Sequence, residues 1–145
     1  MKIYLAGPLF TTAEREFNVK LANLLRNAGH EVWLRQEHEQ RHTSAEEVFR
    51  KDVEGIEWSE VVVANMDGPD PDSGTCWECG YAYQKRPVIF RTDFRTGEQP
   101  GKAPYNLMLA QSATIQIPPA LFIDTESLSR KIRAELDRCL ATAHH

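Results

Sequence analysis

The chain has 145 residues, a formal net charge of -4, and acidic and basic side chains interspersed along its length. This length fits a single domain spanning residues 1–145. The chain has no basic stretch of the kind that binds nucleic acid or an anionic membrane, so we expect small molecules or proteins as partners. Three cysteines, no signal-peptide pattern and no apolar run of membrane-spanning length favour a reducing, cytoplasmic setting.

Strand and helix signals alternate through the chain. Short apolar runs predict five strands, at residues 2–6, 31–34, 60–64, 86–90 and 114–117. Amphipathic segments, two of them opened by capping boxes at Thr11 and Ser44, predict helices at residues 11–29, 44–57, 73–86 and 127–141, with a short one after Pro104. This alternation is typical of an α/β fold, a doubly wound, flavodoxin-like or Rossmann-like five-stranded parallel sheet. We expect the strand order 2-1-3-4-5, which places the turns after the first and third strands beside one crevice.

The turn after the first strand, Ala6-Gly7-Pro8-Leu9-Phe10, occupies the position of the phosphate loop in dinucleotide-binding folds. It has one glycine, and Pro8 has no N–H group, so it would hold a pyrophosphate poorly. Phe10 suits packing against a flat apolar ligand such as a nucleobase. A hydrophobic staple at the start of the first helix is an equally good interpretation of Phe10.

Asp52 lies on the apolar stripe of the second predicted helix, together with Ala45, Val48, Phe49, Val53 and Ile56. A carboxylate that faces inward needs partners, because burying it unpaired is costly. The residues alone leave two interpretations open: Asp52 caps a neighbouring loop, or it binds a ligand at the crevice.

The stretch Pro71-Asp72-Ser73-Gly74-Thr75-Cys76-Trp77-Glu78-Cys79-Gly80 follows the third strand and predicts a strand-to-helix turn. Gly74 lets the backbone bend, and Ser73 is placed to cap the helix. Glu78 falls about one turn inside the helix, near its positive end. Because such turns lie where open sheets bind ligands, we interpret Glu78 as a nucleophile and Asp72 as its acid/base partner.

Cys76 and Cys79 are spaced like a redox pair, and a thiol near a helix N-terminus has a lowered pKa. Both positions also match the core-facing side of the helix, which is the interpretation we favour. No second pair of ligands follows at metal-binding spacing, so we expect neither a metal nor an organic cofactor. The long polar loop at residues 92–103 has the length of an active-site lid.

Three stretches, in order and spacing, resemble the nucleoside 2-deoxyribosyltransferase family over roughly residues 3–110. They are Ile3-Tyr4-Leu5-Ala6-Gly7-Pro8, Pro71-Asp72-x-Gly74-Thr75-x-x-Glu78-x-Gly80 and Asn106-Leu107-Met108-Leu109. The loop at residues 35–43 matches no part of the family pattern.

The resemblance implies a role for each matching polar residue. Glu78 would attack the anomeric carbon, Tyr4 would help to hold the Glu78 carboxylate, and Asp72 would handle the base nitrogen. Asp52 and Asn106 would hold deoxyribose hydroxyls. Further substrate contacts are expected from Gly7, Phe10 and Met108.

The reaction implied by the resemblance is exchange of the base of a 2-deoxyribonucleoside, through a covalent ester on Glu78 and with retention of configuration. Such an enzyme takes 2-deoxyribonucleosides and free nucleobases and serves nucleoside salvage. We expect a homo-oligomer in which Asn106 completes the sugar site of a neighbouring chain. The alternatives are a hydrolase that cleaves deoxynucleoside 5′-monophosphates and a catalytically silent nucleotide-sensing module.

Overall fold

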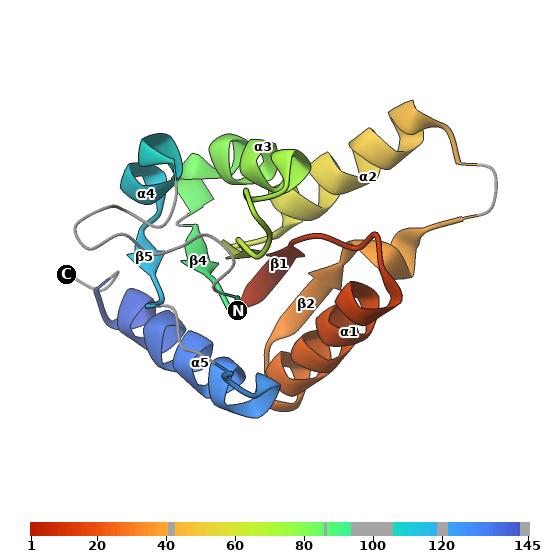
Figure 1. Ribbon diagram of the computed structural model, residues 1–145. Coiled ribbons are helices and arrows are strands. Elements are labelled where there is room, and N and C mark those ends of the chain that lie inside the picture. The colour runs from red at the N-terminus through yellow and green to blue at the C-terminus, as the bar shows by residue number, and fades with distance from the viewer. Residues whose placement is uncertain (41–42, 86, 94–105, 119–121, 143–145) are drawn as a thin grey trace.

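The computed structural model describes residues 1–40, 43–85, 87–93, 106–118 and 122–142 (Figure 1). Its strands are β1 (Lys2–Ala6), β2 (Glu31–Leu34), β3 (Val61–Asn65), β4 (Val88–Phe90) and β5 (Ile115–Gln116). Its α-helices are α1 (Thr12–Asn27), α2 (Ala45–Trp58), α3 (Ser73–Tyr81), α4 (Leu107–Ser112) and α5 (Thr125–Thr142), and two short 3₁₀ helices are η1 (Arg35–His38) and η2 (Tyr83–Lys85).

The five strands form one sheet in which every neighbouring pair is parallel. Their order is β2-β1-β3-β4-β5, so the predicted fold class and strand order are confirmed. β1 and β3 are neighbours at the centre, with Ala6 beside Ala64 at their carboxyl ends. The chain leaves β1 and β3 toward opposite edges of the sheet, so a crevice opens between the two turns that follow these strands.

The helices cover both faces of the sheet: α1 and α5 lie on one side, and α2, α3 and α4 lie on the other (Figure 1). Because side chains alternate along a strand, β1 sends Ile3 and Leu5 into the core beneath α1 and α5, and Tyr4 and Ala6 into the core beneath the other helices. Tyr4 therefore points from the central strand toward α3. Within the described ranges, no helix is long and apolar enough to cross a membrane.

Both predicted capping boxes are present and set the starts of α1 and α2. Thr11 accepts a hydrogen bond from the backbone N–H of Glu14, and Ser44 accepts one from that of Glu47, while each glutamate bonds back to its cap. α1 ends just before Gly29, which has a φ of +91°, a conformation that favours glycine.

Several sequence expectations are wrong in detail. Asp72, not Ser73, caps α3, and Ser73 is the first helical residue. Within the predicted loop at residues 35–43, residues 35–38 form the 3₁₀ helix η1. Phe49, placed on the buried stripe of α2, is 52% exposed, because the start of that helix extends beyond the sheet (Figure 1). The expected lid lies mostly outside the described residues.

Candidate active site

A cavity of about 330 Å³ opens at the carboxyl ends of the central strands. Its walls come from the turn after β1, the turn after β2, the inner side of α2 and the first turns of α3. The residues that line it are Gly7, Leu9, Phe10, Arg35, Asp52, Asp72, Ser73, Gly74, Thr75 and Glu78. The structure thus gathers most of the sequence-predicted site residues around one space.

Glu78 is held from behind by the central strand. The hydroxyl of Tyr4 donates a hydrogen bond of 2.6 Å to Oε1 of Glu78, across 74 residues of sequence. Tyr4 is almost fully buried in the core beneath α3, so its ring orientation is fixed by packing. The second oxygen, Oε2, makes no hydrogen bond to any described residue, which leaves it available to a ligand.

The surroundings of Glu78 favour its neutral form. Burial raises the pKa of this carboxyl from its ordinary value of 4.5 to about 7. The Tyr4 hydrogen bond and the charge of Arg35 lower the pKa, whereas the charges of Asp52 and Asp72 raise it. Burial and the adjacent Glu78 also raise the pKa of Tyr4, so its hydroxyl stays protonated and remains a donor. A partly buried carboxylate with a perturbed pKa in a cleft is typical of a functional group.

Asp72 combines a structural contact with an open oxygen. Its Oδ2 accepts hydrogen bonds from the backbone N–H of Thr75 at 2.9 Å and from the Thr75 hydroxyl at 3.0 Å. Its Oδ1 bonds to no described residue. Gly74 provides the room for this arrangement, because a Cβ added there would lie 3.1 Å from Oδ2. Asp72 therefore caps the helix with one oxygen and presents the other at the cavity.

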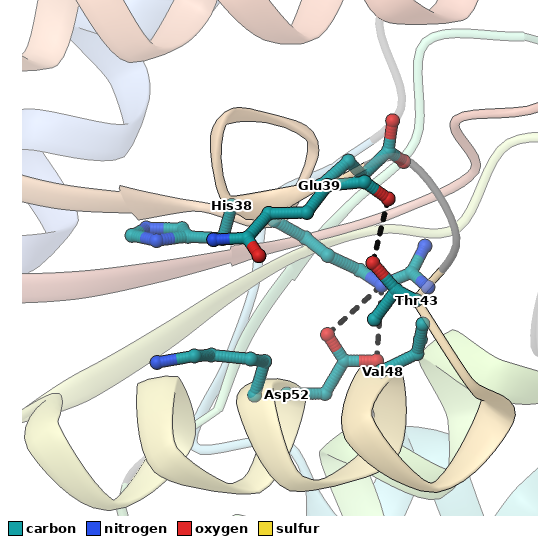
Figure 2. A pocket seen from close by; sticks show the side chains of 8 residues that line it. His38, Glu39, Thr43, Val48 and Asp52 are labelled. Atoms are coloured by element: carbon teal, nitrogen blue, oxygen red, sulfur yellow. Dashed lines mark hydrogen bonds and ion pairs between the residues drawn. The ribbon is translucent and has the colours of Figure 1, made fainter.

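Asp52 of α2 is held by Arg35, from the preceding element η1. The Nε–H of Arg35 donates to Oδ1 of Asp52 at 2.9 Å and to Oδ2 at 3.0 Å, marked by the two dashed lines at Asp52 in Figure 2. Burial raises the pKa of Asp52, and the charge and hydrogen bond of Arg35 lower it. Among the described residues, the hydrogen-bond partner of Asp52 is the Arg35 side chain, and Asp52 caps no backbone loop there.

The turn after β1 contributes one backbone wall and one exposed ring. A Cβ on Gly7 would lie only 3.0 Å from Cβ of Asn65, so the close approach of this turn to the end of β3 favours glycine. Phe10 is 74% exposed while lining the cavity, which rules out the hydrophobic-staple interpretation. Its ring is free to contact a ligand.

Asn106 and Met108 lie apart from this cavity. They line a second, larger space of about 770 Å³ between α3 and α4, together with Cys76, Gly80 and Tyr83. Oδ1 of Asn106 caps α4 by accepting the Met108 N–H at 2.8 Å, and the Met108 side chain is 74% exposed. Within one chain, the structure therefore does not join these two predicted substrate-binding residues to Glu78.

The cysteines have the packing of core residues. Cys79 is buried in the core beneath α2, α3 and α4, and Cys76 packs against that core. Both thiols are free, and burial raises the pKa of Cys76 and brings that of Cys79 to about 12, the opposite of what a reactive pair requires. Among the described residues, no group of three or more histidine, cysteine, aspartate and glutamate side chains could hold a metal ion.

Arg35 is a charged cavity residue that was not predicted from the sequence. It is the first residue after β2, and β2 lies beside β1 in the predicted strand order. Residues that directly follow the strands of a parallel sheet gather at the same edge, so its position was a usable signal. The pairing with Asp52, 17 residues later, could not be read from local pattern.

Solved structures of similar fold include a 2-deoxyribosyltransferase and an N-glycosidase. A 2-deoxyribosyltransferase from Bacillus psychrosaccharolyticus is 32% identical and has a TM-score of 0.65, with 89% of this chain and 90% of that chain covered. A conserved protein from Enterococcus faecalis V583 is 24% identical, with a TM-score of 0.72 and coverage of 93% and 98%. A CMP N-glycosidase from Clostridium botulinum is 16% identical, with a TM-score of 0.63 and coverage of 93% and 99%. The last two likenesses concern the fold alone.

The family comparison covers most of the chain. No curated protein matches the sequence of this chain significantly. The family model described as nucleoside 2-deoxyribosyltransferase matches residues 3–108, a span that contains Tyr4, Asp52, Asp72, Glu78 and Asn106. With this match, and with the architecture and the carboxylate cavity described above, the chain belongs to the nucleoside 2-deoxyribosyltransferase family.

Proposed function

We propose that this protein exchanges the base of 2-deoxyribonucleosides through a covalent deoxyribosyl ester on Glu78, with retention of configuration. The observation that carries the proposal is the 2.6 Å hydrogen bond from Tyr4 to one oxygen of Glu78, which leaves the other oxygen open beside a cavity that also contains Asp72. Family membership supports the same chemistry.

In the first half-reaction, Oε2 of Glu78 attacks C1′ of the deoxyribose while the bond from C1′ to the base nitrogen breaks. The transition state resembles an oxocarbenium ion, which a carboxylate stabilises. The step starts from ionised Glu78 with one proton on Oδ1 of Asp72, the oxygen that Thr75 does not occupy, and the departing base takes that proton. The products are a deoxyribosyl ester of Glu78, a free base and an ionised Asp72.

In the second half-reaction, a nitrogen of another base attacks C1′ and displaces the Glu78 carboxylate. Its proton passes to Asp72, which restores the starting state of both carboxyl groups. Two displacements at the same carbon give net retention. Tyr4 supports the carboxylate as it leaves, because its hydroxyl remains a donor to Oε1. No metal or organic cofactor takes part in this scheme.

The charge of the cavity favours a nucleoside over a nucleoside monophosphate. Its lining carries the carboxyl groups of Asp52, Asp72 and Glu78, and Arg35 is its one cation among the described residues. Since Arg35 is already paired with Asp52, a doubly charged phosphate would enter a site of net negative charge. The hydrolase of deoxynucleoside 5′-monophosphates therefore ranks second, although the CMP N-glycosidase shares the fold.

We also propose that the working enzyme is a homo-oligomer in which Asn106 of one chain holds a sugar hydroxyl in the site of another. Within a chain, Asn106 and Met108 line a different space from Glu78. The exposed side chains of Leu107 and Met108 give this part of α4 an apolar surface that suits contact with a second copy.

The test is to incubate the protein with deoxyinosine and adenine and to separate the products by chromatography. Deoxyadenosine together with hypoxanthine would support the transferase. Hypoxanthine with free deoxyribose would indicate a hydrolase, and parallel incubation with deoxyinosine 5′-monophosphate would test whether the phosphate is required. Binding of deoxyinosine without any product would identify a catalytically silent module.

A further inference from the structure

We propose that Arg35 is a positioning residue of this site: it fixes the Asp52 carboxylate toward the sugar and balances the negative charge around Glu78. The inference rests on the proposed function, because it assigns Arg35 a part in binding and ionising the groups of that same cavity.

The geometry of the pair supports a positioning role. A single N–H group of Arg35 is shared between both oxygens of Asp52, at 2.9 Å and 3.0 Å. This orients the carboxylate plane while using little of its capacity, since an ionised carboxylate accepts at about four lone-pair sites. Oxygens of Asp52 therefore remain able to accept hydrogen bonds from sugar hydroxyls. The two side chains are only 26% and 17% exposed, so water competes weakly for this contact.

The pair also stands between two spaces. Arg35 and Asp52 line the catalytic cavity, and they line an outer cavity of about 290 Å³ as well. Figure 2 views this outer cavity, with Asp52 on α2 across from His38 and Glu39 of the turn after β2. Lys51 also lines the outer cavity. Without Arg35, the Asp52 carboxylate would be able to rotate toward that side and away from the substrate.

The same contact sets the charge around the nucleophile. The ionisable groups that face Glu78 come from every element around it: Tyr4 from β1, Asp52 from α2, Asp72 from the cap of α3, and Arg35 from the turn after β2. Two of these groups, Asp52 and Asp72, are carboxyls that raise the pKa of Glu78, Tyr4 is a neutral hydrogen-bond donor, and Arg35 is the one cation among the four. Arg35 lowers the pKa of Glu78 and of Asp52, whereas Asp52 raises the pKa of Glu78.

A neighbouring ion pair provides a matched control. Arg26 pairs with Glu37 of the same 3₁₀ turn, at 2.9 Å and 2.6 Å, but it lines neither cavity. Arg26→Gln therefore removes an arginine–carboxylate pair from the same turn without touching the site. An effect of Arg35→Gln that Arg26→Gln reproduces would belong to the stability of the turn rather than to the cavity.

The first measurement follows the ionisation of Glu78 directly and needs no turnover. Protein labelled with ¹³C at the glutamate side-chain carboxyls is titrated by NMR, with the Glu78 signal assigned by its loss in Glu78→Gln. We expect Arg35→Gln to move the Glu78 midpoint to higher pH, Asp52→Asn to move it to lower pH, and Arg26→Gln to leave it in place. Arg35→Lys, which keeps the charge, should stay nearer to the wild-type midpoint than Arg35→Gln.

The second measurement separates orientation from charge. For base exchange, we expect Arg35→Gln and Arg35→Lys to raise KM for the deoxynucleoside about tenfold or more, the size expected for losing a hydrogen bond between charged groups. If Arg35 acts through Asp52, adding Arg35→Gln to Asp52→Asn should raise KM by less than about threefold, because contacting residues are not additive.

An unchanged Glu78 midpoint in Arg35→Gln, or additive effects on KM in the double variant, would overturn the proposal. If the wild-type protein performs no exchange, the proposed function fails, and the NMR titration still decides whether Arg35 controls the ionisation of Glu78. Circular dichroism and thermal unfolding of each variant identify any that fails to fold, in which case the Arg35→Lys variant provides the comparison.

Discussion

Replacing Glu78 with glutamine should make the protein more stable at alkaline pH while removing its proposed nucleophile. In the folded protein the pKa of Glu78 is raised from 4.5 to about 7, chiefly by burial. The folded state therefore binds this proton more tightly than the unfolded state does. Between pH 4.5 and pH 7, the unfolded chain loses the proton first, so the carboxyl makes folding progressively less favourable as the pH rises.

The size of the effect follows from the shift in pKa. A difference of 2.5 units, from 4.5 to about 7, corresponds to about 3 kcal/mol of folding free energy above pH 7. Glutamine does not ionise, and its side-chain oxygen can still accept the hydrogen bond from Tyr4. The free energy of unfolding of Glu78→Gln, relative to the wild type, should therefore increase by about 3 kcal/mol between pH 4 and pH 8.

Urea unfolding of both proteins, followed by circular dichroism from pH 4 to pH 8, measures this difference. Because the comparison uses the change with pH, any constant cost of the amide cancels. Glu16→Gln, which removes an exposed carboxylate of α1, serves as the control and should follow the wild type. Parallel stability curves for Glu78→Gln and wild type, within about 0.5 kcal/mol, would refute the argument that burial sets the ionisation of Glu78.

Three further predictions concern the neighbouring groups. Asp72→Asn should keep the fold, because an amide oxygen can still cap α3. It should slow exchange by about a hundredfold or more, since an amide cannot supply the proton. Near-normal rates with natural bases would remove Asp72 from the mechanism. Replacing both Cys76 and Cys79 with serine should leave exchange within about twofold of wild type, allowing for some loss of stability from altered packing; activity that depends on the reducing agent would revive a redox role. Glu78→Ala and Asn106→Ala should each have little activity alone. When equal amounts of the two are mixed and the chains exchange as a symmetric dimer, about half of the dimers are mixed and each of these has one intact site, so about a quarter of wild-type activity should return. Sedimentation of a fully active monomer would contradict the shared site.

The fold was predictable because local signals and global topology agree. Each strand is a short apolar run, and the two capping boxes at Thr11 and Ser44 place the helix starts within one residue. The alternation of strands and helices then leaves few topologies to consider. The start of α3 was less predictable, because Asp72 and Ser73 are adjacent and both are good caps. In the structure Asp72 is the cap, and its carboxylate accepts hydrogen bonds from both the backbone N–H and the hydroxyl of Thr75.

The missed features depend on contacts between segments that are distant in the sequence. The helical period places Phe49 on the buried stripe, but at that point α2 has passed the edge of the sheet, and the ring instead packs against Trp77 with centroids 5.3 Å apart. Arg35 is an ordinary charged residue by composition. Its place directly after β2 predicts the correct edge of the sheet, but its pairing with Asp52 depends on the packing of the turn after β2 against α2, which no local pattern encodes.

Asn106 and Glu78 line separate cavities of one chain, and no local pattern of the sequence shows this separation. A sequence motif says which residues a family uses and not whether they belong to one chain. The two residues line different spaces within the chain, so their proposed cooperation requires a second copy. Mixing Glu78→Ala subunits with Asn106→Ala subunits tests this requirement.

The proposed function depends on a covalent bond between the Glu78 carboxylate and the sugar. Its most direct test is to mix the protein with a 2-fluoro deoxynucleoside, whose fluorine destabilises the oxocarbenium-like transition state and slows turnover of the ester. We expect a burst of free base no larger than the number of active sites, and a fluorodeoxyribosyl adduct located by peptide mass spectrometry on the peptide that contains Glu78. Glu78→Ala should lose both the burst and the adduct. An adduct on a peptide that lacks Glu78, or full base exchange by Glu78→Ala, would show that Glu78 is not the nucleophile.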